Sequence, residues 1–142
     1  MPDTFIKRSI SAGGARRVVE GAAARAASMG LPVSIAVCDE SGVLKEFSRM
    51  DGAPLLSVEL AKDKAYTAAA FGIATHEWFE FIKNDPPLLH GITKVPRLIV
   101  FGGGNPLKIG DLVVGAIGIS GGHYAQDMQI ATAGCEALAE DA

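Results

Sequence analysis

An apolar run extends from Val113 to Ile119, a length typical of a fully buried strand. Two glycines, Gly121 and Gly122, follow it, and from Tyr124 onward the residues have a helical composition. This pattern predicts a junction of strand, turn and helix. Such a junction presents backbone N–H groups at a helix start, where the positive end of the helix dipole favours an anionic group. We therefore expect the functional pocket to border this turn.

The N-terminal third of the chain is predicted to form one helix and one β-hairpin. Ser9 or Ser11 can cap the helix, valines and many alanines give it an apolar face, and Gly30 ends it. Residues 33–39 and 43–50 are strand-like, and the sequence between them favours a tight turn. The two strands are therefore expected to pair with each other.

The middle of the chain is predicted to be mostly helical. Pro54 fits the start of a helix that we expect over residues 55–71, because proline is well accommodated in a first helical turn. A shorter helix is expected from Thr75, its predicted cap, through Phe81. The prolines that follow must end this helix, and residues 86–95 are expected to form an irregular loop.

The C-terminal third is predicted to complete a sheet. Residues 97–101 have the composition of a strand, and residues 107–109 and 112–119 are expected to form a second hairpin. The last helix is expected over residues 124–140. This order of elements predicts one α+β domain over residues 1–142, with a five-stranded, mostly antiparallel sheet flanked by helices.

Composition and charge narrow the classes of function. The 142 residues are 49% hydrophobic and 20% charged, as in a globular domain with one core. A net charge of −3 provides no basic surface for phosphates, so we expect neither nucleic acid nor a membrane as partner. The first residues lack the features of a signal peptide, and no apolar run approaches the roughly 20 residues that span a bilayer. We expect a cytoplasmic protein.

Residue types that ligate metals are few. Cys38 and Cys135 make neither a disulfide framework nor a zinc set, and we interpret both as small buried hydrophobic residues. His76 and Glu80 lie one helical turn apart and resemble half of a zinc-protease motif, but the sequence identifies no third ligand. A solvated helix start is the simpler interpretation. His76 and His90 are the candidate metal ligands.

Two glycine-rich segments resemble catalytic loops but lack their other residues. Gly102–Gly104 lacks the Gly-Lys-Ser/Thr ending of a phosphate loop, so we expect a backbone bend close to another chain or a ligand. Residues 118–122 match G-x-S-x-G, but the only histidine after Ser120 precedes Asp127, the reverse of the order in such hydrolases. Ser120 is therefore predicted to be a turn residue that caps the last helix.

Several charged residues are candidates for ion pairs or a polar pocket. Glu59 and Lys62 are expected to pair on the surface of the central helix. Lys64 falls on the alanine-rich side of that helix, where it could reach into a cleft as an anion anchor, although a surface lysine is an equal alternative. Arg49 and Asp51 lie where a strand ends and could pair with each other or flank a pocket.

Five segments together resemble the GlcG/HbpS family, in order and with appropriate spacing over nearly the whole chain. They are IAVCD at residues 35–39, RMDGAP at 49–54, KAYTA at 64–68, VGAIGISGG at 114–122, and Gln126 with Asp127. The resemblance implies a profilin-like domain, assembly into a homo-oligomer and, in some members, binding of haem or related tetrapyrroles. It also implies similarity to the domain that follows the adenosyltransferase in PduO proteins.

The chain departs from the usual pattern of this family in three places. His123 and Tyr124 stand where small residues or threonine are more usual after the paired glycines. Asn105 stands where an aliphatic residue is common before Pro106, and the segment 78–95 is individual. These departures leave two hypotheses of different classes open.

The first hypothesis is a small-ligand-binding protein that holds haem, or a related planar ligand, in a cleft near the Gly121-Gly122 turn. Imidazole is a common ligand of haem iron, so the candidate axial ligands are His76, His90 and His123. The apolar walls of this cleft are expected to come from Phe47, Phe71, Leu88 and Leu89.

The second hypothesis is a cytoplasmic catabolic enzyme that acts on a small carboxylate or carbonyl metabolite by proton transfer, as an isomerase or a lyase does. Lys64 and N–H groups near Gly121 would hold the anion, and His123 or Asp127 would act as acid or base. Across both hypotheses the candidate ligand-binding residues are Arg49, Asp51, Lys64, Gly121, Gly122, His123 and Tyr124. A scaffold or sensor domain without chemistry is the third alternative.

Overall fold

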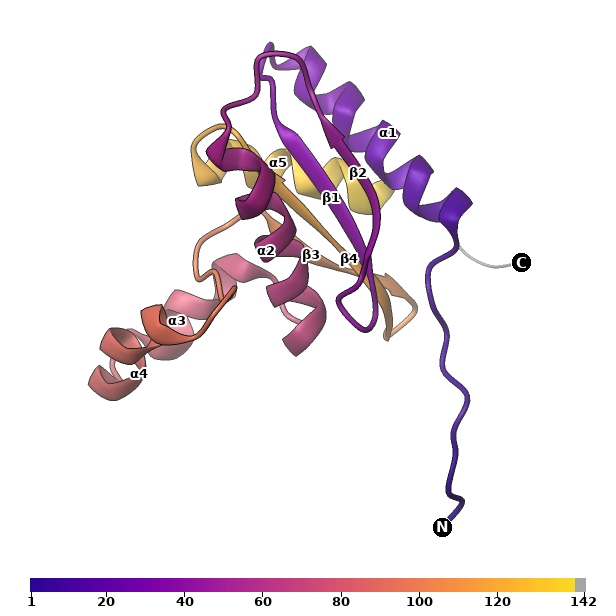
Figure 1. The fold of residues 1–142 in the computed structure, drawn as a ribbon, viewed down its shortest axis with the longest axis vertical. Coiled ribbons are helices and arrows are strands. Elements are labelled where there is room, and N and C mark those ends of the chain that lie inside the picture. Colours follow the sequence, from indigo (N-terminus) through magenta and orange to yellow (C-terminus); the bar gives the residue numbers. More distant parts are fainter. Residues whose placement is uncertain (140–142) are drawn as a thin grey trace.

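The fold is built on a four-stranded antiparallel sheet with the strand order β2-β1-β4-β3. The structure is a computed structural model that describes residues 1–139. The strands are β1 (Ser34–Asp39), β2 (Leu44–Arg49), β3 (Gly104–Ile109) and β4 (Leu112–Ser120). Both predicted hairpins are confirmed, and they join along β1 and β4 at the centre of the sheet (Figure 1).

Three longer helices cover the two faces of the sheet (Figure 1). α1 (Ala12–Ser28) and α5 (Tyr124–Glu136) pack on one face, and α2 (Leu56–Phe71) packs on the other. The Ser11 hydroxyl, one of the two expected caps, accepts a backbone N–H of the first turn of α1 at 3.0 Å. α5 ends earlier than expected, and residue 140 lies outside the described residues.

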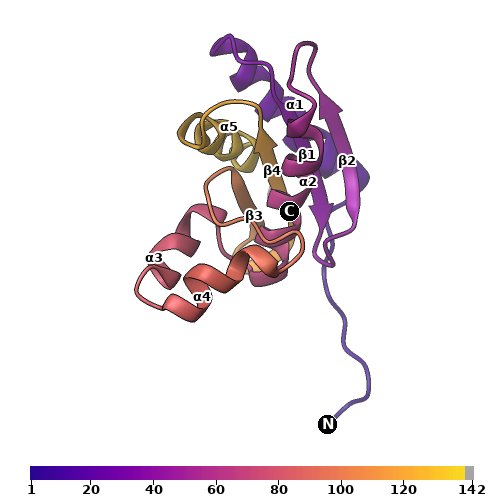
Figure 2. The ribbon, with the colours of Figure 1, turned by 60° about the vertical axis from the view of Figure 1, so that its left-hand side comes forward.

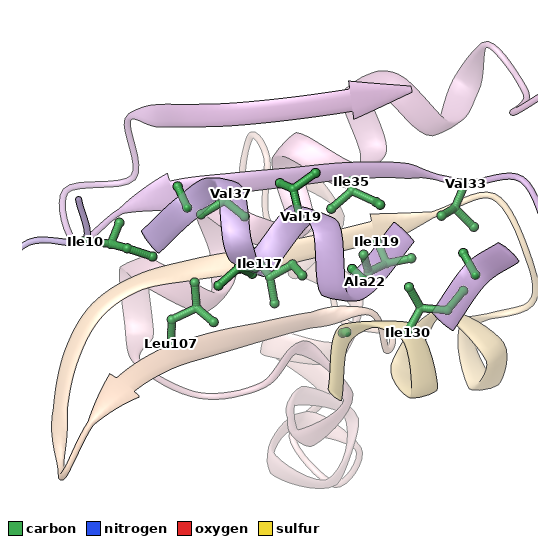
Figure 3. Packing of buried hydrophobic residues seen from close by; sticks show 14 of the residues in the cluster. Ile10, Val19, Ala22, Val33, Ile35, Val37, Leu107, Ile117, Ile119 and Ile130 are labelled. Atoms are coloured by element: carbon green, nitrogen blue, oxygen red, sulfur yellow. The ribbon is translucent and has the colours of Figure 1, made fainter. Parts of the chain in front are cut away.

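The main core lies between the sheet and the layer of α1 and α5. Residues two apart on a strand share a face, which places Ile35 and Val37 of β1 beside Ile117 and Ile119 of β4. Figure 3 shows these side chains packed toward the helices that cover this face, where Ile130 of α5 meets them. All five side chains are fully buried.

The opposite face of the sheet is built from small residues, so α2 lies very close to it. The contacting residues are Ala36, Cys38 and Ala116 of the sheet and Ala61, Ala65 and Ala68 of α2. β4 carries Gly118 at this contact because a Cβ there would run into the carbonyl of Ala61. This close approach brings Lys64, on the next turn of α2, to the end of β4.

A unit of short helices projects from one end of the sheet (Figures 1 and 2). It consists of the 3₁₀ turn η1 (Thr75–Glu77), α3 (Trp78–Ile82), α4 (Pro86–Gly91) and the 3₁₀ turn η2 (Ile92–Lys94). Its own small core contains Trp78, Ile82 and Ile92. The short helix expected from Thr75 is thus present, but the Thr75 hydroxyl binds the backbone of Gly104 instead of capping it.

The expectation of an irregular loop over residues 86–95 is wrong. The Asp85 carboxylate accepts the N–H of Leu88 at 3.5 Å and caps α4. Two prolines occupy the first turn of this helix, where their missing N–H groups would have had no partner within the helix. The prolines therefore start a helix here as well as ending the one before.

The expected strand over residues 97–101 is also absent, so the sheet has four strands and not five. Arg97 has a φ of +66°, which breaks an extended conformation. The Thr67 hydroxyl of α2 donates to the carbonyl of Arg97 at 2.8 Å and accepts from the N–H of Ile99 at 3.0 Å. A side chain of α2 thus satisfies backbone groups that a neighbouring strand would otherwise satisfy.

Candidate functional site

A buried ion pair lies where β4 ends and α5 begins. Lys64 extends from α2 and Asp127 from the first turn of α5, and Lys64 Nζ lies 3.0 Å from Asp127 Oδ2. Both side chains are almost completely buried. Lys64 Nζ also donates to the carbonyl of Ile119 at 2.8 Å, and Asp127 Oδ1 accepts from the N–H of Gly122 at 3.1 Å. The pair therefore connects α2, the end of β4 and the turn before α5.

Burial disfavours the charged forms of both groups. Desolvation lowers the pKa of Lys64 and raises the pKa of Asp127, while the attraction between the two groups opposes both changes. Neither group has free access to solvent, so Lys64 could reach an external anion only after breaking its contact with Asp127. The geometry therefore gives little support to Lys64 as an anion anchor or to Asp127 as an acid or base.

The bend expected at Gly102–Gly104 is confirmed, and it packs against this ion pair. Gly103 has a φ of +124°, and a Cβ at this position would lie 2.7 Å from both Ile119 O and Lys64 Nζ. A Cβ on Gly104 would run into the carbonyl of Lys64. Only glycine allows the chain to pass this close to α2 and β4.

His123 caps α5, so the expectation that Ser120 does so is wrong. His123 Nδ1 accepts the N–H of Ala125 at 3.1 Å, while the side chain of Gln126 accepts the N–H of His123 at 3.0 Å. Ser120 is the buried last residue of β4 and lies three positions before the N-cap residue His123. The centroids of the His123 and Tyr124 rings lie 4.1 Å apart on the surface. The order of strand, turn and helix at this junction is as the sequence predicts.

A mostly apolar pocket of about 500 Å³ lies beside this junction. Its lining residues are His76, Phe79, Glu80, Val100, Phe101, Gly102 and Tyr124. They come from η1, from α3, from the segment before β3 and from the first residue of α5. Phe79, Phe101 and Tyr124 are each about half exposed (52%, 42% and 49%). Half-exposed aromatic side chains around one hollow are typical of a binding site.

The ion pair lies directly behind one wall of this pocket. Lys64 Nζ is 5.2 Å from the centroid of the Phe101 ring. Gly102 packs between α5 and η1. A Cβ at this position would run into the Met128 side chain of α5 and lie 3.4 Å from the Cβ of His76 in η1. The segment 101–104 thus has the pocket on one side and the buried charges on the other.

Other candidate residues do not line the pocket. Arg49 donates two hydrogen bonds to the carbonyl of Ala53, and Asp51 is exposed in the turn between them. His90 is exposed on α4, and Gly121 and Gly122 form the turn beside the pocket. Of the candidate residues named from the sequence, His76 and Tyr124 line the pocket. The role of each candidate stays a prediction.

The four side chains that were expected to form apolar walls do not line this pocket. Phe47 packs under Lys62, which also forms the predicted ion pair with Glu59 at 3.5 Å. Phe71 packs edge-on against Trp78, with ring centroids 4.8 Å apart. Leu88 and Leu89 belong to α4 and do not line the pocket. Sequence reasoning missed three pocket residues, Phe79, Val100 and Phe101. The only local signal in the sequence was for Phe101, which directly precedes the glycine bend.

Metal-ligating residues do not gather in the described part of the chain. Within residues 1–139, no group of three or more His, Cys, Asp and Glu side chains is arranged to hold a metal ion. His76 and Glu80 both line the pocket, and Glu80 pairs with Lys83 at 2.6 Å. The pocket thus offers a single imidazole, which suits a ligand that brings its own metal more than a bare metal ion.

The fold and the pocket define a class: an α+β domain with an antiparallel four-stranded sheet, a glycine-rich junction and an adjacent apolar pocket. Comparison with known proteins identifies the family. The chain belongs to the HbpS-like family, described as haem degrading protein HbpS-like, which it matches over residues 10–136. The resemblance to the GlcG/HbpS family is therefore confirmed.

Three relatives show how far this similarity extends. The 15.0 kDa protein of the dhaT-dhaS intergenic region of Citrobacter freundii is 31% identical, and the alignment covers 93% of this chain and 94% of that protein. The corrinoid adenosyltransferase PduO of C. freundii is 36% identical over 86% of this chain, which spans only 37% of PduO. A solved complex of PduOC with haem is 34% identical, covers 92% of this chain and 95% of PduOC, and superposes with a TM-score of 0.83.

No helix among residues 1–139 is long and apolar enough to cross a membrane.

Proposed function

We propose that this protein binds haem, or a related planar tetrapyrrole, in the pocket between α3, the 101–104 bend and the start of α5. The observation that carries the proposal is a pocket of ligand size that combines half-exposed aromatic rings with one imidazole. Ligand pockets typically enclose roughly 300–1,000 Å³ and are lined by apolar and aromatic side chains with a few polar groups. The haem complex of the related PduOC supports this choice of ligand.

The residues of this pocket fit a haem group in three respects. Phe79, Phe101 and Tyr124 provide rings against which a flat macrocycle could stack. His76 is the candidate iron ligand, because it is the one histidine among the pocket residues. Lys83 offsets the negative charge of Glu80, which would otherwise repel the haem propionates. Bound haem would supply redox chemistry that the side chains alone lack.

The alternative of an acid–base enzyme is less well supported by the geometry. Lys64 and Asp127 neutralise each other in the interior, and His123 uses its Nδ1 atom to cap α5. The three candidate catalytic residues thus already have structural partners. Haem binding would instead use His76 and the aromatic rings of the pocket, whose side chains are exposed.

Titration of the purified protein with haemin tests the proposal. We expect a shifted and sharpened Soret band in the wild type, and loss of that shifted band in His76→Ala because the iron ligand is removed. His90→Ala is the matched control, since His90 lies on α4 and does not line the pocket. A wild type without a Soret change would refute haem binding. An unchanged spectrum in His76→Ala would refute the role of His76 alone.

A further inference from the structure

The buried ion pair connects the two segments that form one wall of the pocket. Lys64 Nζ holds the carbonyl of Ile119, and the N–H of Ile119 donates to the carbonyl of Gly103 at 2.8 Å. Asp127 holds the N–H of Gly122, two residues before Tyr124. The chain of contacts therefore runs from the 101–104 bend, through the ion pair, to the turn that positions Tyr124.

General stability does not explain why two charges are placed at this position. A buried ion pair recovers its desolvation cost only with excellent geometry, and apolar replacements of similar size are often neutral or stabilising. The surrounding contacts on this face of the sheet are made by alanines, Cys38 and a glycine, with no other charged side chain buried to this extent among residues 1–139. The pair is therefore better explained by what its hydrogen bonds hold in place.

Lys64 also contacts Phe101, a side chain that lines the pocket. The ammonium group lies 5.2 Å from the centroid of the Phe101 ring, within the range of a cation–π contact. The same ammonium is adjacent to Gly103, where even a methyl group would come within 2.7 Å of it. Movement of Lys64 would thus free both the aromatic wall and the bend that follows it.

We propose that Lys64 and Asp127 are positioning residues that hold Phe101 and Tyr124 at the spacing required by the ligand. This inference rests on the proposed function for the identity of the ligand, but the tie between the two segments does not depend on it. Neither residue touches the ligand. Both act through the 101–104 bend and the 121–123 turn.

The test replaces the pair with apolar residues of similar size, in the double variant Lys64→Met/Asp127→Leu. The matched control is Ser34→Ala/Ser57→Ala, which removes a buried hydrogen bond of 2.8 Å between the same helix α2 and β1. β1 supplies no residue of the pocket. Three measurements are made on each protein: thermal unfolding, haemin titration, and amide hydrogen exchange of segments 101–104 and 119–124.

We expect the double variant to unfold cooperatively but to bind haemin about 10- to 100-fold more weakly, the range for loss of groups that orient a site. Its Soret maximum should move, and hydrogen exchange should accelerate in both segments but not in α1. The control should keep the affinity, the spectrum and the exchange rates of the wild type. The variant Lys64→Met/Asp127→Asn retains an acceptor for Gly122 N–H and should recover protection of segment 119–124 only.

Two outcomes would overturn the inference. Unchanged affinity and exchange in a folded Lys64→Met/Asp127→Leu variant would show that the pair does not position the wall. Loss of cooperative unfolding in that variant would show that the pair supports the whole domain and not the pocket. If the wild type binds no haemin, the proposed function fails, and the exchange measurements alone then decide whether the pair ties the two segments together.

Discussion

Replacement of Gly103 by alanine tests how closely the glycine bend packs against the ion pair. The new methyl group would lie 2.7 Å from the backbone carbonyl of Ile119, which is fixed in the central strand β4. It would also lie 2.7 Å from Lys64 Nζ, which could move only by giving up its hydrogen bonds in the interior. The φ of +124° is itself unfavourable for alanine.

The expected loss of stability has two parts. The positive φ costs an alanine about 1–2 kcal/mol, the order expected for a sparsely populated backbone conformation. Displacing Lys64 from Ile119 O removes a hydrogen bond to a charged group, which contributes about 1.5–3 kcal/mol. Together we expect Gly103→Ala to lower the free energy of unfolding by about 2.5–5 kcal/mol, or Tm by roughly 5–20 °C for a chain of this length.

Gly30→Ala is the matched control because it isolates the first part. Gly30 has a φ of +64°, but no atom lies within 4 Å of the position of an added Cβ. We expect this variant to lose only about 1–2 kcal/mol. Urea and thermal unfolding of both variants give the comparison. Equal losses would refute the reasoning, because they would mean that the closeness of Gly103 to Lys64 and Ile119 costs nothing.

Four further predictions concern the rest of the fold. Burial raises the pKa of Cys38 to about 12 and that of Cys135 to about 11, so neither thiol should react with iodoacetamide at about pH 8 until the protein unfolds, as mass spectrometry would detect. Both pKa values are higher in the folded protein than in the unfolded chain, so the folded state holds the thiol protons more tightly. The resulting contribution to the free energy of unfolding should be complete below about pH 8.5 and should decline as the pH rises toward 11. Urea unfolding at a series of pH values measures this decline. Ile117→Ala should cost about 2–5 kcal/mol of unfolding free energy because Ile117 is fully buried between the sheet and its helices, and a loss below 1 kcal/mol would contradict that packing. Ser11→Ala should cost about 1 kcal/mol by removing the cap of α1, and an unchanged Tm would show that the cap is not needed.

Local signals in the sequence were sufficient for the elements whose residues specify their own conformation. The 39–44 turn and the apolar runs of β1 and β4 are each read from a few adjacent residues, and all were predicted correctly. The errors lie in segments whose conformation depends on distant partners. Residues 97–101 have the composition of a strand, but the Thr67 hydroxyl of α2 takes their backbone hydrogen bonds.

The candidate site was predictable only in part, for the same reason. The sequence placed the functional pocket beside the Gly121-Gly122 turn, and the structure has an apolar pocket beside that turn, with Tyr124 in its lining. It named His76 as a candidate ligand without indicating that Phe79 and Phe101 would surround it. Those rings come from separate elements, α3 and the segment before β3, and no sequence spacing relates them.

The sequence by itself determined the secondary structure around the central hairpins, the glycine junction and the family of this protein. The tertiary structure alone decided the pairing of Lys64 with Asp127, which are 63 residues apart, and the enclosure of the pocket. The physical reason is that periodicity reports which face of an element is apolar, whereas a buried charge finds its partner only when the fold brings side chains of α2 and α5 together at the end of β4. The small residues of α2 and β4, Gly118 among them, let α2 lie close enough to the sheet for Lys64 to reach Asp127.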